Sequence, residues 1–248
     1  MHLSVIIPAY NEEKRIAKTL EDIDNYLSKQ SYDYEIMVVS DGSTDRTSEI
    51  VKEEAKNIKS LRLIEFKKRL GKGGGVREGM LEAKGDFRIF IDADNSTSID
   101  QIEKMWPYFK NACPEPVEGG YGVVIGSRDV KGAVLDPPQP WIRNIILGEG
   151  FKLYRKLIIG LWEIQDTQCG FKCFTKKAAE EIFPKCRIDH FAFDSEVLVI
   201  GKSLGYKIKE IPVYWKNDPE SKVNFKSIIK MAVDLLKIRW NLIAKKYD

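Results

Sequence analysis

Short apolar runs alternate with segments of helical periodicity through the first hundred residues. The runs LSVIIPAY, YEIMVVSDGS, SLRLIEF and FRIFIDAD have the β-rich composition of strands. The segment after the first run places Ile16, Leu20, Ile23 and Leu27 on one helical face. Four strand–helix units in succession predict an α/β fold with a mainly parallel, doubly wound sheet and helices on both faces. A chain of 248 residues is long enough to bury the core of such a domain.

The expected elements divide the chain into a domain over residues 1–222 and a cationic amphipathic helix over residues 223–248. In the first half we expect a helix near 44–55, with Ser43 or Thr44 as its N-cap, and another in SIDQIEKMWPYF. The second half predicts an apolar helical stretch over 141–162, a turn and strand in DTQCGFKCF, then a helix before the segment HFAFDSEVLVIGKSLG, and a strand in KIKEIPVYW.

Polar and acidic residues follow three of the predicted strands. The first strand ends in the run from Pro8 to Glu12, the second at Asp41, and the fourth at Asp92 and Asp94. Because ligands of doubly wound sheets bind at the carboxyl ends of the strands, this distribution predicts a ligand site at that edge.

Asp92 and Asp94 are one residue apart, directly after the apolar run Ile89-Phe90-Ile91. Such a pair can bind Mg²⁺ or Mn²⁺, hard cations that take oxygen ligands and can bridge to a diphosphate. The structural alternative is an aspartate that caps the helix expected near Ser98. The position of the pair, in a sheet whose other strand ends carry acidic residues, favours the metal site.

The glycine-rich run GKGGGVREG matches neither of two familiar phosphate-binding loops. Lys72 is followed by Gly73 rather than Ser or Thr, and Val76 stands where a dinucleotide fingerprint needs its third glycine. Small residues let the backbone approach a ligand closely, and Lys72 and Arg77 add positive charge. A flexible turn leading into a helix explains the run equally well.

The cysteines, the apolar runs and the charge exclude several classes. No CxxC pair is present, and we expect buried thiols in a reduced, cytosolic setting rather than a pair of metal ligands at Cys169 and Cys173. The sequence contains no run of 18 apolar residues, so no transmembrane helix is predicted. A net charge of +3 and the lack of a basic groove with aromatic platforms argue against nucleic acid as a partner.

Several motifs together resemble those of a known family. VIIPAYNEE, VVSDGSTD, GKGGGVREG and IDADNST resemble the inverting family 2 glycosyltransferases of GT-A fold. Further on, GSR at 126–128, DTQCGFKCF at 166–174, FAFDSEVL at 191–198 and PVYW…ESK at 212–222 resemble the dolichyl-phosphate β-glucosyltransferases. That family moves glucose from UDP-glucose to a polyprenyl phosphate, and the related mannosyltransferases use GDP-mannose.

The resemblance implies roles at the donor end of the site. Asp92 and Asp94 would hold Mg²⁺ or Mn²⁺ on the diphosphate, so that the cation assists departure of the nucleotide, with Asp94 also counted as catalytic. The residues implied to contact the donor are Pro8, Ala9, Tyr10, Glu12, Asp41, Lys72, Arg77, Asp92 and Gln168.

A phosphate acceptor changes what the chemistry requires. A phosphate monoester is already anionic near neutral pH, so no general base is needed and cations must hold two anionic reactants together. The resemblance implies Arg128 and Lys222 for this role, with Lys172 and Ser221 in support. Asp194 and Glu196 would orient sugar hydroxyls, or act as base in relatives with hydroxyl acceptors; charge at a helix N-terminus is the structural alternative.

Basic residues and apolar residues alternate along the last 27 residues of the chain. The basic ones are Lys222, Lys226, Lys230, Lys237, Arg239, Lys245 and Lys246. With the implied polyprenyl acceptor, this pattern and the apolar stretch over 141–162 favour attachment to an anionic membrane surface, on its cytoplasmic face and without a spanning segment. Packing against the domain or a partner subunit is the alternative, and the oligomeric state is left open.

Three other functions stay in competition. The first is a mannosyltransferase that uses GDP-mannose and the same lipid acceptor. The second is a soluble family 2 enzyme with a saccharide hydroxyl as acceptor, for which Asp194 or Glu196 would be the base. The third is a nucleotide-sugar-binding scaffold protein without turnover.

Overall fold

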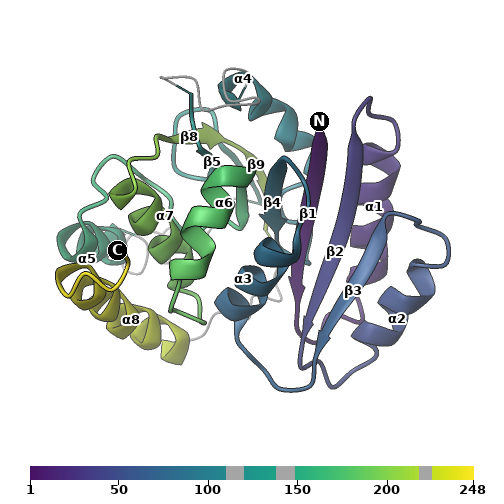
Figure 1. Ribbon diagram of the computed structural model, residues 1–248, viewed down its shortest axis with the longest axis horizontal. Helices are drawn as coiled ribbons and strands as arrows, with labels where there is room; N and C mark the ends of the chain where they lie inside the picture. The colour runs from purple at the N-terminus through teal and green to yellow at the C-terminus, as the bar shows by residue number, and fades with distance from the viewer. Residues whose placement is uncertain (110–119, 138–148, 218–224) are drawn as a thin grey trace.

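The computed structural model describes residues 1–109, 120–137, 149–217 and 225–248. Its centre is a seven-stranded sheet of order β3-β2-β1-β4-β7-β5-β8, and a second sheet pairs β6 with β9 (Figure 1). The strands are β1 His2–Ala9, β2 Asp33–Asp41, β3 Leu61–Phe66, β4 Phe87–Ile91, β5 Val123–Ser127, β6 Val134–Asp136, β7 Phe171–Thr175, β8 Ile208–Pro212 and β9 Tyr214–Lys216.

Most neighbouring strands are parallel, which confirms the predicted sheet. β1 pairs in parallel with β2 and β4, β2 with β3, and β5 with β8. β7 is the exception, because it lies antiparallel to both β4 and β5. Its first residue, Phe171, is therefore opposite Ile91, the last residue of β4. The segment that enters β7 thus reaches the edge at which the parallel strands end.

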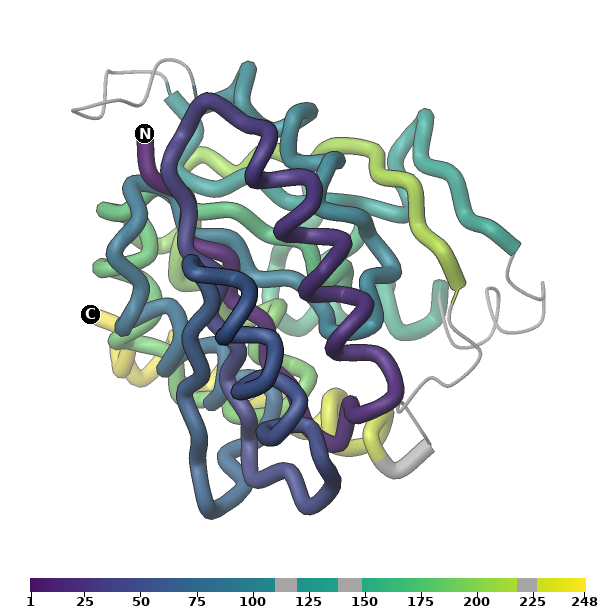
Figure 2. The backbone as a smooth tube through the Cα atoms, turned by 90° about the vertical axis from the view of Figure 1, so that its right-hand side faces the viewer, coloured from purple at the N-terminus to yellow at the C-terminus, as the bar shows by residue number. Residues whose placement is uncertain are grey.

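Helices cover both faces of the sheet (Figures 1 and 2). Alternation along the strands produces two buried clusters, one including Ile6, Val39 and Phe90 and the other Val5, Val38 and Ile89. The helical elements are α1 Ile16–Leu27, α2 Thr47–Glu54, α3 Lys72–Glu82, η1 Ile99–Lys104, α4 Trp106–Phe109, α5 Gly150–Ile159, α6 Lys176–Ile182, η3 Phe183–Lys185, α7 Phe193–Ser203 and α8 Phe225–Ile243.

Two expected helices in the first half have different bounds. α2 begins at Thr47 rather than near 44, because the Asp45 carboxylate accepts hydrogen bonds from the Thr47 N–H and hydroxyl and holds the preceding turn. The single helix expected in SIDQIEKMWPYF is instead the 3₁₀-helix η1 followed by the one-turn α4. Pro107 accounts for the break, since its nitrogen has no hydrogen to donate to the preceding turn.

The second half follows the expected order of elements. The helical stretch predicted over 141–162 appears as α5, which ends at Gly160 in the left-handed region, while residues 138–148 lie outside the description. The cationic helix appears as α8, which buries Leu235 and Ile238 in the core. The predicted division at 222/223 falls among residues 218–224 and is likewise not described. Of the helices in the described ranges, none has the length and apolarity needed to cross a bilayer.

Candidate active site

The paired aspartates follow β4 directly and face a lysine. Lys72, the first residue of α3, places its Nζ 2.6 Å from Asp92 Oδ1, and each side chain is 22% exposed. Burial lowers the pKa of Lys72, but the carboxylates of Asp92, Asp194 and Asp94 outweigh it and raise the pKa above its usual value. The ammonium is therefore the positive charge that offsets the repulsion within the aspartate pair.

Asp94 lies in a turn that is rich in oxygen atoms. Its Oδ1 accepts a 2.9 Å hydrogen bond from the Ser96 N–H, while burial and the charge of Asp92 raise its pKa. The buried side-chain oxygens Asn95 Oδ1, Ser96 Oγ and Thr97 Oγ1 have no hydrogen-bond partner among the described residues. The Asp94 carboxylate, with its raised pKa, and the unpartnered oxygens beside it together fit a hard cation.

The protein offers only part of a metal coordination shell. No group of three or more His, Cys, Asp or Glu side chains in the described ranges could hold a metal ion by itself. A cation at Asp92 and Asp94 would therefore depend on oxygens from a bound ligand or water. This fits the expected Mg²⁺ or Mn²⁺, which retains water and commonly shares phosphate oxygens.

Gly170 makes room for the Asp92 carboxylate. A Cβ atom at position 170 would lie 2.1 Å from Asp92 Oδ2, far inside van der Waals contact. Gly170 reaches this position because antiparallel β7 starts opposite the end of β4. The DTQCGFK segment therefore shapes the aspartate pair directly.

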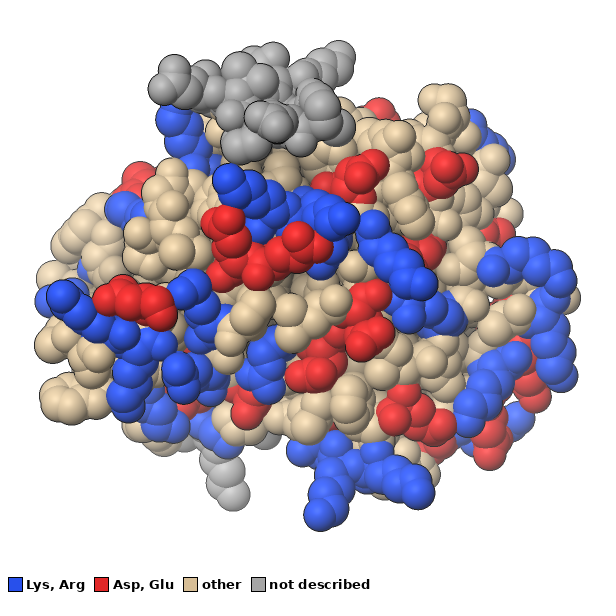
Figure 3. Space-filling view, in the orientation of Figure 1, with Lys and Arg blue, Asp and Glu red and all other residues tan. Residues whose placement is uncertain are grey.

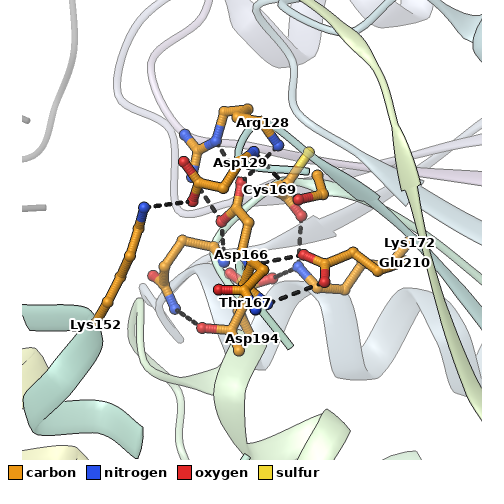
Figure 4. Close-up of polar contacts among 12 residues, drawn as sticks. Arg128, Asp129, Lys152, Asp166, Thr167, Cys169, Lys172, Asp194 and Glu210 are labelled. Carbon is orange, nitrogen blue, oxygen red and sulfur yellow. Dashed lines mark hydrogen bonds and ion pairs between the residues drawn. The ribbon is translucent and has the colours of Figure 1, made fainter. Parts of the chain in front are cut away.

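The same segment holds Arg128 through Asp166 (Figure 4). Arg128 Nε and Nη2 lie 2.6 and 2.9 Å from the two carboxylate oxygens, a bidentate pair in which the Asp166 side chain is 3% exposed. Burial raises the pKa of Asp166, but Arg128 and the N–H of Gln168 hold it far below its usual range. The guanidinium carbon also lies 4.7 Å from the centre of the Trp215 ring.

Two further contacts fix the backbone before Asp166. Glu210 accepts hydrogen bonds from the N–H groups of Gln165 and Asp166, at 2.9 and 2.7 Å. Arg155 on α5 is 1% exposed and donates to the carbonyl of Ile164 at 2.9 Å. Glu210 on β8 and Arg155 on α5 therefore both hold the backbone at residues 164–166.

Lys172 is engaged inside the protein. Its side chain is fully buried, and its Nζ lies 2.5 Å from both Asp194 Oδ1 and the Cys169 carbonyl oxygen (Figure 4). Burial raises the pKa of Asp194, against the lowering effect of Lys172. The prediction placed Lys172 at an acceptor phosphate, whereas the structure gives its charge a partner in the interior. The Gln168 side-chain amide lies 3.5 Å from the hydroxyls of Thr167 and Ser195, while its backbone N–H donates to Asp166 Oδ1 at 2.9 Å.

Asp194 and Glu196 point to different surroundings, although the sequence analysis treated them together. Residues two apart on a helix lie on different faces. The Glu196 carboxylate is fully buried and accepts from the N–H groups of Arg187 and Ile188, at 3.0 and 2.8 Å, and from the Tyr247 hydroxyl at 2.6 Å. Glu196 therefore supports the loop that contains Arg187 and Ile188, whereas Asp194 contacts Lys172.

Asp41 and Tyr10 support the loop before α3. The Asp41 carboxylate is 3% exposed and accepts from the N–H groups of Leu70 and Gly71, at 2.5 and 2.8 Å. The Arg69 guanidinium lies 3.7 Å from the centre of the Tyr10 ring. Next to them, Ala9 is buried at the end of β1, and Gly75 packs near Pro8. Asp41 and Tyr10, two of the predicted donor residues, thus contact the loop before α3.

The glycine run packs against the protein itself. A Cβ at Gly71 or Gly73 would lie 2.3 or 2.4 Å from the carbonyl oxygens of Asp189 and Ile188. Arg77 also faces this loop, with its Nη1 2.9 Å from Asp189 Oδ1. Arg77 and these glycines therefore hold α3 to the 187–190 loop.

The other predicted residues are placed as follows. Glu12 Oε2 accepts from Arg15 at 2.6 Å, and Ser221 and Lys222 lie outside the described residues. Basic and acidic side chains are interspersed over the face seen in Figure 3. The roles of Asp166, Gly170 and Tyr247 could not be predicted from the sequence, because their partners are distant in the chain and leave no local pattern.

Comparison with known proteins gives consistent matches. The model of the family "Glycosyl transferase family 2" matches residues 4–183. A dolichyl-phosphate beta-glucosyltransferase of Trichomonas vaginalis is 37% identical over 244 residues, covering 96% of this chain and 71% of that protein. The human protein of the same name is 34% identical over 246 residues, covering 96% and 74%.

Solved structures share the fold at low identity. Glucosyl-3-phosphoglycerate synthase from Mycobacterium tuberculosis, solved with Mn²⁺, UDP and glucosyl-3-phosphoglycerate, matches with a TM-score of 0.64 and 16% identity. The match covers 96% of this chain and 78% of that one. Mannosyl-3-phosphoglycerate synthase from Rubrobacter xylanophilus has a TM-score of 0.69 and 12% identity, covering 99% and 75%.

Proposed function

The chain belongs to glycosyltransferase family 2, a family of enzymes, and we propose that it transfers glucose from UDP-glucose to a dolichyl or other polyprenyl phosphate. The observation that carries the proposal is the DTQCGFK segment, which positions Arg128 through Asp166 and makes room for Asp92 through Gly170. Sequence similarity supports glucose and dolichyl phosphate, since relatives at 34–37% identity over nearly the whole chain are named dolichyl-phosphate beta-glucosyltransferase. UDP as the nucleotide rests on the resemblance of the motifs.

In the donor end of the site, Asp92 and Asp94 would hold Mg²⁺ or Mn²⁺. When bound, the cation would offset the negative charge that develops on the leaving nucleotide. Lys72 already lies at Asp92 and stays charged. Its ammonium could therefore turn to the donor phosphates when the Asp92 carboxylate binds the cation. Asp41 and Tyr10 hold the loop beside the nucleotide.

In the acceptor end, Arg128 would bind the phosphate of the lipid. An arginine carries five N–H donors, and Asp166 engages Nε and Nη2, so donors are left for phosphate oxygens. Because a phosphate monoester is already anionic, the site needs cations to hold it and no group to remove a proton. Attack on C1 opposite the departing nucleotide would invert the configuration.

The surface formed by α5 and α8 would rest on the membrane. Seven large apolar side chains on these helices are between 47% and 64% exposed, namely Leu153, Leu157, Ile229, Val233, Leu236, Trp240 and Ile243. We call this set the apolar stripe. α8 also exposes Lys230 and Arg239, and Lys245 and Lys246 are exposed just after it. These cations suit anionic lipid, and Figure 3 shows basic side chains beside uncharged surface where α8 lies.

The apolar stripe is connected to the acceptor end through α5. Lys152, one residue before Leu153, places its Nζ 2.9 Å from the carboxylate of Asp129, the neighbour of Arg128 (Figure 4). If the phosphate of a lipid binds Arg128, its hydrocarbon chain could therefore lie along α5. This relationship supports a lipid acceptor over a soluble saccharide.

The test is a partition assay with radiolabelled UDP-glucose or GDP-mannose, polyprenyl phosphate, and Mg²⁺ or Mn²⁺, with and without EDTA. We expect label from UDP-glucose in the organic phase, lost with EDTA and in the Arg128→Lys variant. Label in the organic phase from GDP-mannose alone would contradict the proposal that glucose is the transferred sugar. Label found only in a water-soluble product, with a saccharide as acceptor, would contradict the proposal that the acceptor is a lipid phosphate.

A further inference from the structure

Tyr247 is buried although it lies four residues beyond the end of α8. The residue is 2% exposed, and its hydroxyl donates a 2.6 Å hydrogen bond to Glu196 Oε1. Asn241 Nδ2 donates to the same hydroxyl at 3.2 Å. One residue earlier, the Lys246 carbonyl accepts from the Arg187 guanidinium, at 3.1 and 3.3 Å. The chain after α8 is therefore fixed against α7 and the loop that precedes it.

Glu196 links Tyr247 to the 187–190 loop. Its carboxylate accepts from the N–H groups of Arg187 and Ile188 as well as from Tyr247. A fully buried carboxylate requires such donors, and loss of one leaves charge that is poorly compensated. The Tyr247 hydroxyl therefore helps to keep Glu196 where it can hold the loop.

The loop in turn holds the first turn of α3. The Asp189 carbonyl accepts from the Gly73 N–H at 2.8 Å and from the Gly74 N–H at 3.4 Å. Asp189 Oδ1 binds Arg77, further along the same helix. Gly71 and Gly73 pack so closely on residues 188–190 that neither could carry a Cβ without movement. A shift of the loop must therefore move α3.

α3 begins with Lys72, the ammonium that lies at Asp92. We propose that Tyr247 is a positioning residue, which acts through Glu196 and the 187–190 loop to fix the first turn of α3 and so place Lys72 at the aspartate pair. The consequence for the donor rests on the proposed function, because it takes the ligand at Asp92 to be a metal–nucleotide.

The test compares Tyr247→Phe with Tyr206→Phe. The matched control removes a hydroxyl that also donates to a carboxylate at 2.6 Å, on Glu181, and Glu181 makes no described contact with the 187–190 loop. Amide hydrogen exchange is measured at Gly73, Gly74, Arg187 and Ile188, with Val38, which is fully buried on β2, as the reference for global stability. The affinity for UDP in the presence of Mn²⁺ is measured by calorimetry at a temperature at which both variants are folded.

We expect Tyr247→Phe to speed exchange at the four amides by about tenfold relative to Val38, the effect of one lost hydrogen bond to a charged group. UDP affinity should fall several-fold, and Tyr206→Phe should change neither. Equal exchange in the two variants would overturn the proposal even if UDP binds. Faster exchange in Tyr247→Phe, with no UDP binding by the wild-type protein, would keep the positioning role and overturn the proposed function instead.

Discussion

Lys72 Nζ lies 2.6 Å from Asp92 Oδ1, at the position where the sequence predicts a divalent cation. Under the proposed function, the lysine would compete with the metal for this carboxylate in the free protein and would bind the donor phosphates in the complex.

Replacement of Lys72 by Met should separate these two roles. Affinity for Mn²⁺ without nucleotide should rise by roughly tenfold, because Asp92 no longer has to release a bound ammonium. Affinity for UDP with Mn²⁺ should fall, because a phosphate contact is lost. Free Mn²⁺ can be followed by its electron paramagnetic resonance signal. Lys52→Met, which removes an exposed lysine 2.9 Å from Glu65, is the control and should leave both affinities unchanged. An unchanged Mn²⁺ affinity in Lys72→Met would refute the competition.

Replacement of Gly170 by Ala should displace Asp92. The new Cβ would overlap the carboxylate, 2.1 Å from Oδ2, and the Asp92 side chain is more easily moved than the backbone at position 170, next to the start of β7. We expect about tenfold weaker binding of Mn²⁺–UDP and a circular dichroism spectrum like that of the wild type. Gly150→Ala is the matched control, since among the described residues outside its own helix no atom lies within 4 Å of a Cβ there. Equal binding in the two variants would mean that Asp92 is not a ligand.

Replacement of Asp166 by Asn should lower stability in a pH-dependent way. Loss of a buried charge partner costs about 2–4 kcal/mol at neutral pH, as part of Arg128 stays in contact with solvent. Because the folded pKa of Asp166 is below its ordinary value of 3.8, its contribution is complete above that value and is lost as pH falls through the folded pKa. The difference between wild type and variant should therefore be constant between about pH 7 and 5 and should shrink below about pH 4.

Urea denaturation at several pH values measures this difference. Glu163→Gln serves as control, because the Glu163–Lys202 ion pair is about half exposed on both sides and should change stability little. A difference between wild type and Asp166→Asn that grows as pH falls would contradict the assigned pairing.

Charge introduced into the apolar stripe should weaken membrane binding. Leu157 and Trp240 are 64% and 63% exposed, so Leu157→Glu and Trp240→Glu place a carboxylate on the surface without disturbing the core. Each should reduce sedimentation with vesicles that contain anionic lipid, and added salt should reduce binding of the wild type further. Leu81→Glu, at a 42% exposed leucine on α3, should bind as the wild type does. Equal loss in all three variants would point to general charge rather than the apolar stripe.

Much of the fold and part of the site could be predicted from residues close together in the chain. Apolar periodicity indicated the strands and helices, and Asp92 and Asp94 followed from their place after β4. Individual side-chain partners could not be predicted in this way. Arg128 meets Asp166 across 38 positions, and Glu196 meets Tyr247 across 51. No sequence spacing encodes such pairs.

The sequence by itself determined the α/β architecture and the edge of the sheet at which polar residues gather, because hydrophobic period and strand-end chemistry are local properties. The family followed from the resemblance of its motifs and from the comparisons. Only the tertiary structure decided which charges meet. Antiparallel insertion of β7 between β4 and β5 brings residues 166–172 to the aspartate pair, gives Arg128 a buried partner and turns Lys172 inward to Asp194. The helical twist of α7 separates Glu196 from Asp194. These partners depend on strand order and helix packing, which are global results of burying two apolar faces of one sheet.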